Sequence, residues 1–161
     1  MTDTSLSTTK VTAKGAAAER LLFTFVAIFT TLGLLGGLYY RELTKLKDFD
    51  TIGHFTQLST VHTHFLALGL LLGFAMLALV RVFDLSRSNK LIPAIWLWAI
   101  GVLLTGGMQV VKGTLQVLGN EAFESPAIAG ISGLGHMIIT VGFILFLMAL
   151  GRGLKLDAHR A

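Results

Sequence analysis

The chain has 161 residues, of which 53% are hydrophobic and only 14% are charged, with a mean hydropathy of +0.74. A soluble domain carries about a quarter charged residues, so this composition excludes an ordinary soluble protein. Cysteine is absent, which excludes disulfides, thiolate metal sites and thioether-linked haem.

The chain begins with a polar segment and continues with four apolar runs. Residues 1–19 are rich in Ser and Thr and predict a disordered cytoplasmic tail. Each of the four charge-free runs that follow is long enough to cross the roughly 30 Å hydrocarbon layer. The first is too long for a signal-peptide core and is interpreted as a retained anchor. The predicted fold class is all-α, a four-transmembrane-helix bundle formed by residues 20–152. Its helices are expected at about 21–41, 58–81, 91–116 and 126–151. Residues 153–161 are expected to form a second cytoplasmic tail.

The distribution of Lys and Arg predicts the orientation of the bundle. The side that would hold both termini carries nine of these residues: Lys10, Lys14, Arg20, Arg81, Arg87, Lys90, Arg152, Lys155 and Arg160. The opposite side carries four: Arg41, Lys45, Lys47 and Lys112. By the positive-inside rule both termini are cytoplasmic, N-in and C-in, in a multi-pass protein of the cell inner (plasma) membrane. This bias explains the basic pI, so no nucleic-acid partner is expected.

The loops and glycines add detail to this bundle. The outer segment 41–57 mixes charges with apolar residues about three apart, which predicts a short amphipathic helix on the membrane surface. The pairs Gly33–Gly37 and Gly69–Gly73 have the small-xxx-small spacing that lets membrane helices approach closely. Gly133 is likewise expected to lie at a contact between helices.

Three of the helices carry side chains able to ligate a metal at one depth. At about 1.5 Å per residue, His64 lies roughly 25 Å above the inner boundary, His136 roughly 24 Å and Met108 roughly 27 Å, with Gln109 beside Met108. Intramembrane ionisable groups are usually functional. No corresponding groups occur further inward, so the level in the outer leaflet is where we expect a site.

His62 and His64 are two residues apart and therefore point about 200° apart on a helix. His62 shares its face with Gly69 and Gly73, which slightly favours His62 as the inward residue. His64 matches His136 better in depth, so the sequence leaves the choice open.

Several functions fit these residues. His136 with His62 or His64 could hold one haem b through two imidazoles, for electron transfer or for gas or redox sensing. A copper or zinc ion would need a third ligand beside such a histidine pair. The second histidine of the HxH pair, which gives the set His62, His64 and His136, could serve, as could Met108 or His54. The alternative is a structural or accessory membrane subunit without a cofactor. No catalytic residue is assigned, and whether the protein is an enzyme stays open. Expected partners are the lipid bilayer, a second copy of the chain or a respiratory-type membrane protein.

The segments "LGLLGGLYYRELTK", "FTQLSTVHTHFLALGLLLGF" and "AIAGISGLGHMIIT" resemble the recurring blocks of a small bacterial four-helix membrane family of unknown function. The block "HTHFLALG" is also similar to one in short haem-copper-oxidase-like membrane proteins, where such histidines are haem or metal ligands. That second resemblance implies the same role for His62, His64 and His136. It does not imply an oxidase, because the large catalytic subunits have many more helices and histidines.

Overall fold

The computed structural model describes the backbone of residues 3–158 and the side chains of residues 13–156. This part of the chain is helical throughout, apart from its turns, and contains no strand. In chain order the elements are α1 (Asp3–Leu46), α2 (Leu58–His64), the π-helix η1 (Phe65–Leu71), α3 (Leu72–Val82), the 3₁₀ turn η2 (Leu85–Arg87), α4 (Leu91–Val117), the 3₁₀ turn η3 (Glu121–Glu124) and α5 (Pro126–Ala158).

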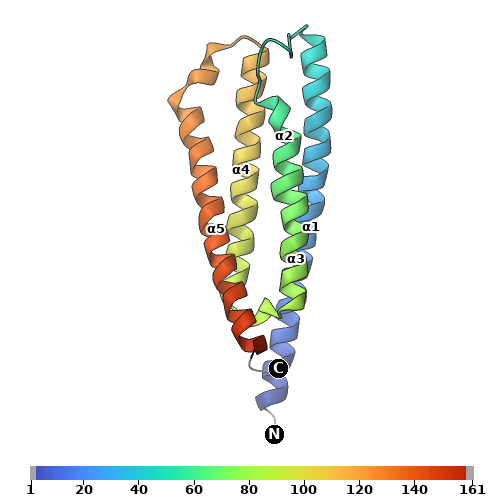
Figure 1. The fold of residues 1–161 in the computed structure, drawn as a ribbon, viewed down its shortest axis with the longest axis vertical. Helices are drawn as coiled ribbons and strands as arrows, with labels where there is room; N and C mark the ends of the chain where they lie inside the picture. The colour runs from blue at the N-terminus through green and yellow to red at the C-terminus, as the bar shows by residue number, and fades with distance from the viewer. Residues whose placement is uncertain (1–2, 159–161) are drawn as a thin grey trace.

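Four stretches of these helices are long and apolar enough to span a membrane, which confirms the predicted fold class. They are Ala13–Leu46, Leu58–Val82, Leu91–Val117 and Pro126–Leu156, and the second is built from α2, η1 and α3 in succession. α1 begins and α5 ends at the same end of the bundle (Figure 1). This arrangement is compatible with N-in and C-in, but which end faces the cytoplasm stays a prediction from the positive-inside count.

α1 starts earlier than the sequence indicated. A disordered tail was expected over residues 1–19, whereas α1 is helical from Asp3. The described side chains explain the order near its start, because Ala18 is fully buried and Lys14 Nζ donates a hydrogen bond of 2.9 Å to the Ser88 carbonyl. Alanine is also the best helix former, so the alanines of residues 16–18 favour the helix.

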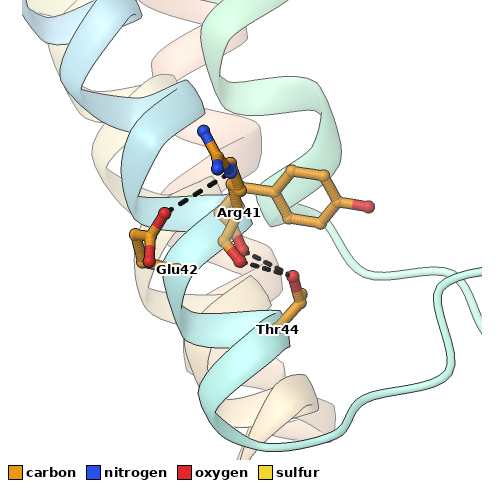
Figure 2. Close-up of polar contacts among 4 residues, drawn as sticks. Arg41, Glu42 and Thr44 are labelled. Carbon is orange, nitrogen blue, oxygen red and sulfur yellow. Dashed lines mark hydrogen bonds and ion pairs between the residues drawn. The ribbon is translucent and has the colours of Figure 1, made fainter.

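α1 also ends later than expected, at Leu46. The hydroxyl of Thr44 donates to the carbonyls of Tyr40 and Arg41 in this last part of the helix, and Arg41 lies beside Glu42 (Figure 2). Residues 47–57 form turns rather than a helix. The separate amphipathic helix predicted over residues 41–57 was therefore wrong, because its first part simply continues α1.

The helices do not all contact one another. α1 packs along α2, η1 and α3, this second span packs on α4, and α5 packs almost entirely along α4. α5 stands at the edge of the bundle, on the side away from α1 (Figure 1). The fully buried Trp98 of α4 lies near the centre, with its ring edge-on to Phe29 at 5.3 Å between centroids.

Glycine sets the closest approaches, as small residues do in membrane bundles. A Cβ on Gly69 would collide with Phe29, and a Cβ on Gly73 would meet Val26 and Trp98. Those two glycines lie at helix contacts, as predicted. Gly133 does not, because nothing lies within 4 Å of the position of its Cβ. The prediction for Gly133 was wrong, and this side of α5 faces away from the other helices.

Candidate functional site

The structure brings together one histidine from each of two helices. His64 is the last residue of α2, and His136 lies in the first half of α5. Both helices pack on α4. His64 is half-buried and His136 is exposed, so the rest of the protein does not cover the space around them.

Contacts with α4 fix the level of the two histidines. Phe65, next to His64, packs against Gly106, while Gly135, next to His136, packs against Thr105. Since residues 105 and 106 are neighbours on α4, the two histidines lie within about one helical turn, roughly 5 Å, of each other along the bundle. The shared depth estimated from the sequence is therefore reproduced in the packing.

Both rings are oriented by their own helices. A ring nitrogen of His136, Nδ1, lies 3.0 Å from the carbonyl oxygen of Ser132, and the ring of His64 faces the carbonyl of Thr60. Each of these carbonyls belongs to the residue four positions earlier. An imidazole that donates its Nδ1–H to a backbone carbonyl keeps a lone pair on Nε2, which is the tautomer suited to binding a metal.

The second histidine of the "HTH" segment points elsewhere. His62 packs against Gly37 of α1 and lines a groove of about 610 Å³ between α1 and the second span, with Gly33, Leu38 and Leu66. Its Nδ1 is buried and has no hydrogen-bond partner. His62 therefore does face another helix, α1, as the face that it shares with Gly69 and Gly73 indicated, while the choice of His62 or His64 as a ligand stays a prediction.

A π-helix begins directly after His64. The wider turn of η1 changes the direction in which carbonyls point, and such turns are frequent at functional sites. The carbonyl of Leu68 in η1 accepts a 2.9 Å hydrogen bond from Trp98 Nε1. α4 thereby fixes the rotation of the segment that carries His64.

Two polar side chains of α4 complete the surroundings. Gln109 and Thr105 are only 7% and 1% exposed, and neither Gln109 Oε1 nor Thr105 Oγ1 has a hydrogen-bond partner in the described structure. Gln109 was visible in the sequence as a polar residue at this depth, but Thr105 was missed, since a threonine in a membrane helix usually bonds its own backbone. Met108 is half-exposed and points about 100° away from Gln109.

The other suggested ligands stay apart from this pair. His54 lies in the loop after α1, where its Nδ1 is 3.6 Å from Asp50. Within the part of the chain that the structure describes, no three His, Cys, Asp or Glu side chains are grouped so that they could hold a metal ion. His159 lies outside the described residues.

Residues 19–153 match the family model described as "Protein of unknown function (DUF2871)". The chain belongs to this family. The match covers all or most of each of the four apolar helices and includes His64 and His136, in agreement with the resemblance to a small membrane family. No curated protein and no solved structure matches the chain, so the resemblance of "HTHFLALG" to haem-copper-oxidase-like proteins is not seen in the comparisons.

Proposed function

We propose that the protein binds one haem b between α2 and α5, with His64 and His136 as its two axial ligands, and that it carries electrons in the membrane. The single observation behind this proposal is the geometry of the two imidazoles. They come from different helices and lie within about one helical turn of each other along the bundle, and His136 Nδ1 lies 3.0 Å from a carbonyl oxygen of its own helix. Two neutral imidazoles on opposed helices are what a six-coordinate haem requires.

The number of available ligands favours haem over a metal ion held by protein alone. Zinc and copper sites in proteins usually take three or four side-chain ligands. The described residues offer two histidines at one level and no group of three ligating His, Cys, Asp or Glu side chains. A porphyrin supplies four nitrogens of its own, so two histidines suffice.

Coordination of the iron by two histidines favours electron transfer over gas sensing, and the position of the pair indicates where the partner would dock. With both axial positions held by imidazole, a gas would first have to displace a histidine. The pair lies in the half of the bundle away from the start of α1, and neither the second span nor α5 carries a further histidine toward the other end within the described residues. A single haem there would exchange electrons with a membrane partner on that side, of the respiratory type.

The test is the reduced-minus-oxidised absorption spectrum, with metal analysis, of the full-length protein purified from cells supplied with haem and copper. Wild type should show a Soret band and near-stoichiometric iron, and His64→Ala or His136→Ala should lose both. His62→Ala is the matched control, because His62 lies two residues from His64 but packs on α1. It should keep the spectrum.

Three results would contradict the proposal. A colourless, metal-free wild type would leave an accessory subunit without a cofactor as the better function. Stoichiometric copper without a Soret band would show that the cofactor is copper and not haem. Loss of haem in His62→Ala together with retention of haem in His64→Ala would show that His62, and not His64, is the ligand.

A further inference from the structure

A second feature lies at the other end of the bundle and concerns a different ligand. A groove of about 470 Å³ lies between α1 and α3, near the end of the bundle at which α1 begins. The rim is formed by Glu19, Arg20 and Arg81, and the walls include Phe23, Phe74 and Leu77. Its charged and apolar parts are therefore segregated along the membrane normal.

The rim carries a positive charge that the protein does not neutralise. Arg81 Nη1 pairs with Glu19 Oε2 at 3.1 Å, which leaves that arginine with one carboxylate. Arg20 is exposed and forms no ion pair with any carboxylate in the described part of the chain. The nearby cations Lys14 and Arg87 are engaged with the Ser88 carbonyl and with Asp84. The groove thus presents the guanidinium of Arg20, which no described carboxylate neutralises.

The walls continue from this rim into the depth expected of hydrocarbon. Phe23 lies one turn beyond Arg20 on α1, and Phe74 lies seven residues before Arg81 on α3, about 10 Å further into the bundle. Phe23 and Phe74 are 59% and 48% exposed, so the helices that the structure describes leave them largely uncovered. An occupant must bring an anion to the rim and an apolar chain to the wall.

We infer that this groove binds an anionic phospholipid. A phosphodiester accepts hydrogen bonds from arginine in the paired geometry that guanidinium favours. The acyl chains extend from that phosphate along Phe23, Phe74 and Leu77. Basic pockets between membrane helices recognise anionic headgroups in this manner. Free phosphate would use the rim but leave the apolar wall without a ligand.

The experiment measures lipid binding to the full-length protein in a neutral detergent by native mass spectrometry. Phosphatidylglycerol and phosphatidylcholine with identical acyl chains are titrated in parallel, and inorganic phosphate is added as a competitor. Wild type should bind phosphatidylglycerol several-fold more tightly than phosphatidylcholine. Arg20→Gln should weaken phosphatidylglycerol binding about 5-fold, the equivalent of roughly 1 kcal/mol per cation near an anionic lipid, and leave phosphatidylcholine unchanged.

Arg41→Gln is the matched control. Arg41 lies on the same helix but at its opposite end, beside Glu42 at 3.5 Å (Figure 2), and its loss should leave lipid binding unchanged. Arg20→Lys should retain part of the preference, because the charge is kept while the paired hydrogen bonds are lost. Equal binding of the two lipids to wild type would overturn the inference. So would equal effects of the Arg20 and Arg41 variants, or displacement of the lipid by inorganic phosphate alone.

Discussion

The contact between α4 and α5 provides the most direct test of the packing, through Gly101→Ala. A Cβ at residue 101 would lie 2.8 Å from the backbone nitrogen of Ile139 and 2.9 Å from the carbonyl oxygen of Gly135. Helix backbone cannot turn aside as a flexible side chain can. Ordinary van der Waals contact starts near 3.4 Å, so the backbone of α5 at Ile139 would have to retreat by about 0.6 Å. Overpacking of this kind costs about 2 kcal/mol.

Gly107→Ala on the same helix isolates that cost. Nothing lies within 4 Å of a Cβ at Gly107, so this variant should show only the helix-propensity gain of about 1 kcal/mol. Gly101→Ala has the same gain, which cancels in the comparison. The two free energies of unfolding should therefore differ by about 2 kcal/mol.

Unfolding of the purified protein by dodecyl sulfate in mixed micelles, followed by circular dichroism, measures both variants against wild type. Gly101→Ala should be the less stable of the two. If the two variants unfold within about 0.5 kcal/mol of each other, the close α4–α5 approach does not exist and the level assigned to His136 is wrong.

Three further predictions follow from other contacts. Trp98→Phe should destabilise the bundle by about 1–3 kcal/mol in the same unfolding assay, because it leaves the Leu68 carbonyl of η1 without its donor. Trp96 is the control, because its ring is exposed and makes no such bond among the described residues. Trp96→Phe should change the free energy of unfolding by no more than about 0.5 kcal/mol. Hydrogen bonds from the backbone of Gly53 and Ile52 hold the pKa of the Asp50 carboxyl below its usual value of 3.8. These hydrogen bonds should keep the loop fully ordered above pH 3.8 and should be lost only as the pH falls through the lowered pKa of Asp50. An NMR titration of the Asp50 carboxyl measures that pKa, and a midpoint above 3.8 would contradict the prediction. Reporter fusions after Lys47 and after Ser88 should give opposite signals, and identical signals would refute the predicted topology.

The sequence alone determined the membrane spans, because the cost of burying charge in hydrocarbon leaves long charge-free runs that can be read directly. It also predicted that His64 and His136 lie at a similar level, since the rise per residue of a helix is constant, and the contacts of their neighbours with Gly106 and Thr105 agree with this. The sequence predicted the ends of α1 less accurately. α1 extends beyond both charged boundaries at Arg20 and Arg41, where packing against the loop at Ser88 and local hydrogen bonds continue the helix.

Only the tertiary structure decided which face of each helix meets another helix. Lipid tails are as apolar as leucine, so burial in protein and exposure to lipid leave the same pattern of apolar residues in the sequence. For this reason Gly69 and Gly133 could not be distinguished, although one packs on Phe29 and the other contacts nothing. For the same reason the sequence could not choose between His62 and His64. In the structure His62 packs on Gly37 of α1 and Phe65, next to His64, packs on Gly106 of α4, so the two histidines lie on different sides of the second span.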